Sequence, residues 1–243
     1  MCLVLVAWQA HPRYPLVVAA NRDEWRERPT EPLHRWEDGL WAGRDRLGGG
    51  TWMAVRRDGA FAATTNFREP GLARGARSRG ELPLRVLRAP GIAAGMRDVG
   101  DDAAAYGGFH VLAADREGLW HQSSRGERVT QLDAGLHGVS NGPRAVAWPK
   151  VHSGLAALAE ALTPDEPDVD ALFALLQDRE QPPDLLLPDT GVGLDMERAL
   201  GARFIDLGTY GTRSSTVVLV GERVRVVERT WDPGGGVVDV WVS

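Results

Sequence analysis

The only cysteine of this 243-residue chain is its second residue, Cys2. Removal of Met1 would leave a thiol and a free α-amine on the same residue. Such an amine has an ordinary pKa of about 7.7 to 8.0 and can accept the thiol proton, so that one residue supplies both nucleophile and base. This chemistry suits attack on a carbonyl carbon. The alternative is a small buried hydrophobic residue, which is the commonest role of a free cysteine.

Four polar residues, Asn21, Arg22, Asp23 and Glu24, directly follow the apolar segment Leu16 to Ala20. An arginine at the end of a strand can hold a thiolate by its charge or bind a substrate carboxylate, and an aspartate can orient a terminal ammonium. The arginine and the α-amine are therefore expected to lower the pKa of the cysteine thiol below about 8.5. The alternative is a solvated turn of mixed charge.

Further motifs occur along the chain at separate places. They are Ala42-Gly43-Arg44-Asp45, Gly49-Gly50-Thr51-Trp52, Thr65-Asn66-Phe67-Arg68 and Gly138-Val139-Ser140-Asn141-Gly142-Pro143. Together with the initial Met1-Cys2-Leu3 and the tetrad at 21–24, they resemble the NRDE family, also called the transport and Golgi organisation protein 2 family. Members of that family are linked to haem trafficking and to lipid or acyl-CoA metabolism.

The same motifs resemble, more distantly, the cysteine N-terminal nucleophile (Ntn) hydrolases of the bile-salt hydrolase and penicillin V acylase kind. Those enzymes place an arginine and an aspartate a few residues apart near the second strand, whereas the matching pair is adjacent here. They stabilise the oxyanion with asparagine side chains and carry a late arginine on a strand. The resemblance implies catalytic roles for Cys2, Arg22, Asp23, Asn66, Asn141 and Arg213.

Substrate contacts are expected from residues that lie near these motifs in the sequence. Asn21, Trp25 and Trp52 are the candidates for the pocket wall. A core position is the ordinary role of tryptophan, of which the chain has nine. The glycines at 48–50 are interpreted as a tight turn between strands.

The elements that must position these residues alternate in blocks along the chain. Several strands are apolar on both faces, as expected when a sheet is covered on each side. Apolar residues at helical spacing predict helices over Glu81 to Arg88, Ile92 to Val99, Val151 to Leu162 and Val169 to Leu176. A proline-rich loop is expected from Gln181 to Asp195. Strands are predicted over Cys2 to Trp8, Leu16 to Ala20, Leu40 to Gly43, Thr51 to Arg56, Ala60 to Thr65, Phe109 to Ala114, Leu119 to Ser123, Val129 to Leu132, Gly135 to Ser140, Thr212 to Val220, Arg223 to Arg229 and Val237 to Val242.

This order predicts the α/β (α+β) class and a four-layer αββα sandwich of two mostly antiparallel sheets, of the Ntn-hydrolase kind. The length suits a single domain over residues 1–243. With a net charge of -5 and no basic stripe, nucleic acid is not an expected partner. No apolar run is long enough to span a bilayer and no signal peptide is evident, so a cytoplasmic location without membrane insertion is expected.

Two functions are compatible with these residues. The first is a cysteine amidohydrolase that cleaves a small linear or lactam amide through an acyl-thioester on Cys2, without a cofactor or a metal. The second is a non-catalytic carrier of haem, lipid or acyl-CoA that uses the same pocket, with a cysteine or histidine as axial ligand for haem. The expected partner is therefore a small-molecule substrate or haem, and no feature of the sequence predicts an oligomeric state.

Overall fold

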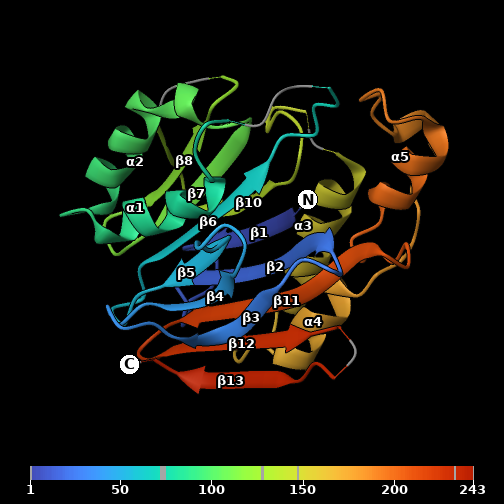
Figure 1. Ribbon diagram of the computed structural model, residues 1–243. Coiled ribbons are helices and arrows are strands. Elements are labelled where there is room, and N and C mark those ends of the chain that lie inside the picture. Colours follow the sequence, from blue (N-terminus) through green and yellow to red (C-terminus); the bar gives the residue numbers. More distant parts are fainter. Residues whose placement is uncertain (1, 72–74, 127–128, 147, 233, 243) are drawn as a thin grey trace.

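Two antiparallel sheets lie face to face, and helices cover both outer faces (Figure 1). The computed structural model describes residues 2–71, 75–126, 129–146, 148–232 and 234–242. The first sheet has the strand order β10-β1-β2-β11-β12-β13. Its strands are β1 (Cys2–Trp8), β2 (Leu16–Trp25), β10 (Gly135–Val139), β11 (Tyr210–Val220), β12 (Val224–Thr230) and β13 (Val237–Trp241).

The second sheet has the order β3-β4-β5-β6-β7-β8-β9. Helices α1 and α2 pack on its outer face, whereas α3 and α4 cover the outer face of the first sheet. The predicted αββα sandwich is therefore confirmed. The remaining elements are β3 (Thr30–Arg35), β4 (Trp41–Asp45), β5 (Met53–Val55), β6 (Phe61–Asn66), β7 (Phe109–Ala114), β8 (Leu119–Ser123), β9 (Thr130–Leu132), α1 (Leu82–Arg88), α2 (Ile92–Asp101), α3 (Pro149–Ala161), α4 (Val169–Leu176), α5 (Leu194–Gly201) and the short 3-10 turns Arg79–Glu81, Ala103–Ala105 and Asp184–Leu186.

Strand β1 is apolar at every position, without alternation between apolar and polar residues, because both of its faces are covered. All seven of its residues are buried. Val4 and Val6 belong to the core between the sheets, while Leu3 and Leu5 belong to the core beneath the helices. Because successive side chains of a strand point to opposite faces, a strand in a covered sheet needs apolar residues on both. Each fully buried aliphatic side chain contributes about 1.5 to 3 kcal/mol.

Strand β2 is longer than the sequence predicts, and this changes how the polar tetrad is positioned. It continues through Trp25 instead of ending at Ala20, because β11 pairs with it along its whole length. The tetrad therefore lies within a strand and not in a turn after one. Alternation sends Arg22 to the face shared by the two sheets, and Asn21 and Asp23 to the face beneath the helices.

Two further elements differ from prediction. Strand β3, at the edge of the second sheet, is polar and contains Pro32, a residue that an edge strand tolerates because it needs no ladder hydrogen bond there. Helix α5 begins at Leu194, within the last residues of the expected loop. No helix of the described residues combines the length and apolar character needed to cross a membrane.

Candidate active site

Cys2 and Arg22 are directly opposite each other in the register of β1 and β2. Both side chains are about nine-tenths buried, with 8% of each residue exposed. They point to the same face of the sheet as Val4 and Ala20, the face that meets the second sheet. Directly opposed residues of an antiparallel pair have Cβ atoms about 4.5 to 5.5 Å apart, so the guanidinium can reach the thiol.

The Cys2 thiol accepts a hydrogen bond from the backbone amide of Asp23. Burial nevertheless raises the pKa of this thiol, and the charge of Asp23 acts in the same direction, against the lowering effect of Arg22. The predicted lowering of the thiol pKa concerns Cys2 with its own free α-amine and stays a prediction. Desolvation of the thiolate outweighs the neighbouring positive charge.

Alternation along β2 directs the Asp23 side chain toward the helical layer, and the residue also contributes to the wall of the Cys2 pocket. It is 2% exposed, and its Oδ1 accepts a hydrogen bond of 2.7 Å from the hydroxyl of Thr212. Burial raises the pKa of the carboxyl group, and the charge of Lys150 is the strongest influence in the opposite direction. An anionic Asp23 thus depends on a cation in the first turn of α3.

Sequence reasoning missed Lys150. The side chain is 2% exposed, and burial lowers its pKa to about 8. One signal was available, because Lys150 is the only lysine in a chain that uses arginine at each of its other basic positions. Position alone did not reveal it, since Trp148-Pro149-Lys150 reads as the ordinary start of a helix.

Asn66 and Asn141 meet between the two sheets. The side-chain amide of Asn141 donates to the backbone carbonyl of Asn66 at 2.8 Å and to its Oδ1 at 3.2 Å. Asn66, at the end of β6, lines the pocket beside Cys2, whereas Asn141 is 1% exposed and is absent from the described residues of the pocket wall. Asn66 Nδ2 donates to the carbonyl of Phe67 at 3.0 Å, which uses one of its two N–H groups.

The turn that carries Asn141 is fixed to the strands on either side. The hydroxyl of Ser140 donates to the backbone carbonyl of Cys2 at 3.1 Å, and Thr65 donates to the carbonyl of Ser140 at 2.5 Å. Hydrogen bonds from this turn to β1 and β6 therefore fix the position of Cys2 relative to Asn66.

A buried histidine pair supports the same turn and was also missed from the sequence. His110 Nε2 lies 2.9 Å from the carbonyl of Gly142, and Nδ1 lies 3.0 Å from Nε2 of His121. A carbonyl only accepts, so Nε2 of His110 carries the proton and its Nδ1 accepts from His121. Burial lowers the pKa of both rings, that of His110 to about 4. Scattered histidines give no pairing signal in the sequence.

Arg213 lines the pocket, and each nitrogen of its guanidinium donates to another part of the protein. A β-bulge places it where Thr212 pairs with Asp23 and the next residue in register is Ser214. Its Nε donates to Asp232 at 2.7 Å, and a terminal nitrogen donates to the backbone carbonyls of Trp25 and Arg28. In this structure the guanidinium fastens the end of β2 to the segment after β12.

Asn21 lies outside the pocket, in contrast to the expectation that it contacts substrate. It is fully buried, and its Nδ2 donates to the carbonyls of Leu176 and Arg203, both at 2.8 Å. Its Oδ1 accepts from the hydroxyl of Ser215. Because side chains alternate along β2, Asn21 points toward the helices, and its hydrogen bonds tie α4 to the sheet.

Trp25 and Trp52 both line the pocket, as predicted for its wall. Trp25 is 53% exposed and packs edge-on against Tyr210, with ring centroids 5.3 Å apart. Burial raises the pKa of Tyr210, and the charges of Asp23 and Cys2 add to this effect. Tyr210 is therefore a further residue of the site that the sequence did not reveal.

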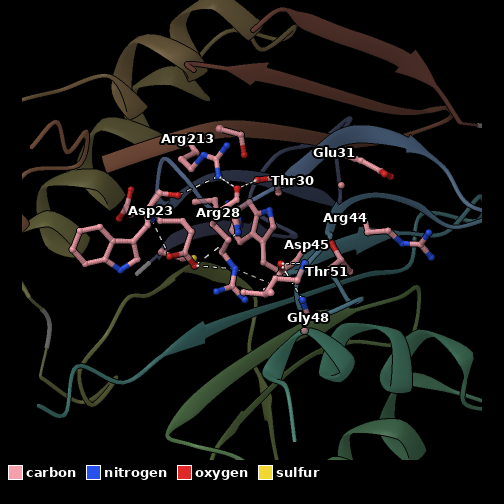
Figure 2. A pocket seen from close by; sticks show the side chains of 18 of the residues that line it. Asp23, Arg28, Thr30, Glu31, Arg44, Asp45, Gly48, Thr51 and Arg213 are labelled. Atoms are coloured by element: carbon pink, nitrogen blue, oxygen red, sulfur yellow. Dashed lines mark hydrogen bonds and ion pairs between the residues drawn. The ribbon is translucent and has the colours of Figure 1, made fainter. Parts of the chain in front are cut away.

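The pocket has a volume of about 950 Å³ and a strongly charged wall. Many of these charges are paired, such as Arg28 with Asp45 at 2.6 Å (Figure 2). Arg44 instead lies over the ring of Trp36, 4.1 Å from its centroid. The charged residues of the wall are Arg22, Asp23, Glu24, Arg28, Glu31, Arg44, Asp45, Arg77, Arg79, Arg213, Glu228 and Asp232.

The glycine motif shapes the opposite wall. Asp45 accepts hydrogen bonds from the amides of Leu47 and Gly48, and this closes the turn (Figure 2). A Cβ atom on Gly50 would lie 2.3 Å from the carbonyl oxygen of Gly80, so only glycine allows the two backbones to approach. The predicted tight turn is present, with φ of 73° at Gly49.

The described residues include no group of three or more histidine, cysteine, aspartate or glutamate side chains that could hold a metal ion. The chemistry that the site can support with its own side chains is nucleophilic. It offers a thiol, an adjacent arginine, a buried carboxylate and an asparagine amide within one pocket.

Comparison with known proteins places this chain in a family. A family model described as Transport and Golgi organisation 2 matches residues 1–233. The Transport and Golgi organization protein 2 homolog of Bos taurus is 31% identical over an alignment of 248 residues, and the match covers 90% of this chain and 88% of that protein. The Homo sapiens homolog is 30% identical over 244 residues, with the same coverage. Two solved variants of conjugated bile acid hydrolase from Clostridium perfringens share the fold, with TM-scores of 0.56 and 0.57, identities of 10% and 9%, and coverage of 99% of this chain and 92% of theirs.

Proposed function

Since the chain belongs to the Transport and Golgi organisation 2 family and has the fold of a conjugated bile acid hydrolase, we propose that it is an N-terminal-cysteine amidohydrolase acting on a small C–N bond. The nucleophile is Cys2 after removal of Met1, and the intermediate is an acyl-thioester. The observation that carries the proposal is the placement of the sole thiol opposite Arg22 at the wall of a pocket of about 950 Å³.

The reaction needs a proton transfer within Cys2. The α-amine takes the proton from the thiol, and the thiolate attacks the carbonyl carbon of the amide. The resulting tetrahedral intermediate collapses, the C–N bond breaks, and the ammonium returns the proton to the leaving nitrogen. Water then attacks the thioester, with the α-amine accepting its proton, and the carboxylic acid and the free thiol are restored.

Asn66 is the residue best placed to stabilise the oxyanion. One N–H of its amide is bound to the carbonyl of Phe67, so the second is available for a ligand. Asn141 is assigned to holding Asn66 in place. Removing one oxyanion donor costs about 10² to 10³ in kcat in related chemistry, so this assignment has a measurable consequence.

The wall of the pocket also limits the substrate. Charged groups of both signs surround the thiol, which favours an amide that carries polar or ionised groups over a purely apolar one. Trp25 and Trp52 supply flat apolar surface at the same pocket. Such a mixture is typical of small-molecule sites, where few apolar walls are combined with placed polar groups.

The carrier function predicted as the alternative would use the same pocket. None of the six histidines, all of which lie in the described part of the chain, lines it, so of the two expected ligand types, cysteine and histidine, only Cys2 is at the pocket. Under this alternative, haem added to the protein gives a Soret band that changes in Cys2→Ala. Binding without hydrolysis of any amide would favour the carrier.

The test of the proposed function uses protein whose intact mass shows that Met1 has been removed. A panel of acyl-amides, linear and lactam, is incubated with the wild type and with Cys2→Ala. We expect release of the amine and a transient mass increase equal to the acyl group, both absent in Cys2→Ala. Turnover that persists in Cys2→Ala, or an acyl group found on another residue, would refute the assignment of the nucleophile.

A further inference from the structure

Four residues form a row across the first sheet, and the row starts at the thiol. In the register of the strands, Arg22 lies opposite Cys2 on one side and opposite Ser214 on the other. Thr230 in turn lies opposite Ser214, so the row crosses β1, β2, β11 and β12 (Figure 1). All four residues line the pocket. Because neighbouring strands are about 4.8 Å apart, the row extends about 14 Å from the thiol.

The orientation of the two hydroxyl residues in this row follows from their neighbours. Ser215 donates a hydrogen bond to Asn21, which lies beneath the helices. Successive side chains of a strand point to opposite faces, so Ser214 points to the face between the sheets. Thr230 shares the face of Val226, four residues earlier on β12, which belongs to the core between the sheets. Both hydroxyls therefore lie on the same side of the sheet as the thiol.

The hydroxyls of Ser214 and Thr230 have no hydrogen-bond partner among the described residues. Ser214 is 8% exposed and Thr230 is partly buried, so a ligand that fills the pocket would cover both. The remaining serine and threonine hydroxyls of the described pocket wall are hydrogen-bonded to the backbone of the protein. They belong to Thr30, Thr51, Thr64, Thr65 and Ser78.

The charged groups near the far end of the row are bound to other parts of the protein. Arg213 pairs with Asp232. Glu228, on β12, accepts hydrogen bonds from the amide of Leu33 at 2.7 Å and from the hydroxyl of Thr216 at 3.4 Å. The far end therefore offers a ligand two neutral hydroxyls, each of which can donate one hydrogen bond and accept others.

We propose that Ser214 and Thr230 form a distal subsite of the Cys2 pocket, which binds a neutral hydrogen-bonding group of the substrate, a hydroxyl or an amide, about 10 to 14 Å from the thiol. The substrate class is thus an elongated hydrophilic amide that lies across the strands from β1 toward β12. This inference rests on the proposed function, because it takes Cys2 as the point of attack.

The physical reason is the cost of covering a hydroxyl without giving it a partner. A hydrocarbon chain laid along the row would remove water from both hydroxyls and form no hydrogen bond with either. A hydroxyl or amide group at the same place restores a partner. One neutral hydrogen bond of this kind changes affinity about fivefold, which sets the size of the expected preference.

The test uses the single cysteine as the attachment point for tails of defined chemistry. Met1-free wild type is alkylated with N-(hydroxyhexyl)iodoacetamide and with N-heptyliodoacetamide, in which a methyl group replaces the hydroxyl. Each rate is divided by the rate of unsubstituted iodoacetamide on the same protein, so that differences in thiol reactivity cancel. We expect the hydroxyl tail to react about fivefold faster than the methyl tail. A ratio of one or less would overturn the inference.

Variants then locate the preference. In the double variant Ser214→Ala, Thr230→Val, the ratio should fall to about one, because the partners of the hydroxyl tail are gone. Thr64→Val is the matched control. Its hydroxyl also belongs to the pocket wall but donates to the carbonyl of His110 at 2.9 Å, so the wild-type ratio should remain. A preference that survives in the double variant would assign the tail to other residues and overturn the inference.

A third tail tests whether the far end selects a neutral group. N-(aminohexyl)iodoacetamide carries an ammonium in place of the hydroxyl. We expect it to react more slowly than the hydroxyl tail. Faster reaction of the ammonium tail would assign the far end to carboxylates such as Glu228 and would overturn the inference.

A wild-type thiol that does not react with iodoacetamide would overturn the proposed function, and the subsite is then decided without a reactive thiol. Cys2→Ala is titrated by calorimetry with N-(hydroxyhexyl)acetamide and with N-heptylacetamide, which carry the same tails. Tighter binding of the hydroxyl tail, by about fivefold, would support the subsite. Equal or weaker binding of that tail, or no binding of either compound, would overturn it.

Discussion

The amide group of Asn141 donates a hydrogen bond of 2.8 Å to the backbone carbonyl of Asn66, and thereby joins the loop after β10 to the end of β6. The resemblance assigns both asparagines to stabilising the oxyanion, but the structure places them one behind the other. Asn66 reaches the pocket, and Asn141 supports it from behind.

This arrangement separates the effects of the two residues. For an amide substrate turned over by the wild type, Asn66→Ala should lower kcat by about 10² to 10³ with little change in KM, as expected when an oxyanion donor is lost. Asn141→Ala should lower kcat less and reduce thermal stability, because it leaves the buried carbonyl of Asn66 without this donor. Equal kcat losses with unchanged Tm in both variants would contradict this division of roles, in which Asn66 reaches the pocket and Asn141 supports Asn66.

The buried position of Asn21 predicts a structural effect. Asn21→Ala should reduce the free energy of unfolding by about 2 to 3 kcal/mol, because two backbone carbonyls lose their donor in the core. The rate of Cys2 alkylation should not change, since the side chain points away from the pocket. Ser215→Ala, which removes one hydrogen bond to Asn21 and the acceptor of the Trp231 indole N–H, is the comparison variant, with a loss of about 1 kcal/mol for each bond. Urea denaturation and alkylation of the same samples provide both values.

Lys150 also gives the stability of the protein a characteristic dependence on pH. Its pKa is about 8 in the folded chain and 10.5 ordinarily, so between these values the unfolded chain binds more protons and stability rises with pH. The difference between wild type and Lys150→Met should therefore shift in favour of wild type by about 3 kcal/mol between pH 7.5 and 10.5. In Arg203→Met, which removes a buried cation that pairs with Asp178, the loss of stability should stay constant over this range, because arginine remains charged. A flat difference for Lys150→Met would mean that the lysine titrates normally.

The His110–His121 pair predicts a loss of stability on the acid side. Burial lowers the pKa of His110 from 6.5 to about 4, so the unfolded chain binds more protons once the pH falls below about 6.5. Stability present above that pH should be lost progressively down to about pH 4, by about 3 kcal/mol from His110 alone. Replacing both histidines by glutamine should flatten the curve. A wild-type Tm that is constant between pH 6.5 and 4 would contradict the assignment of two neutral rings.

Much of the fold could be predicted because the apolar pattern of each strand reflects its layer. Cys2 to Trp8 is apolar throughout and lies in a sheet covered on both faces. The extent of β2 could not be predicted in the same way. Its last residues are polar, and only the pairing with β11, which lies almost 200 residues later, shows that they continue the strand.

The site was predictable in part, for a related reason. Cys2, Arg22 and Asn66 stand out as motifs and do meet at one pocket. The role of a polar residue in a strand depends on the face to which it points, and the face is fixed by register. Asn21 and Arg22 are adjacent in the sequence but point to opposite layers, and no local pattern distinguishes them.

The first sheet separates residues that line the pocket from residues that lie on its other face, beneath the helices. Residues in front of it, such as Trp52, contact whatever occupies the pocket, whereas Lys150 and Glu197 lie behind it, outside the pocket wall. Substitutions in front can therefore alter which compound is accepted, while substitutions behind, as at Asn21, alter how firmly the helices are held to the sheet. An evolving or engineered lineage could therefore change selectivity and stability independently, because β1 and β2 keep the two sets of residues apart.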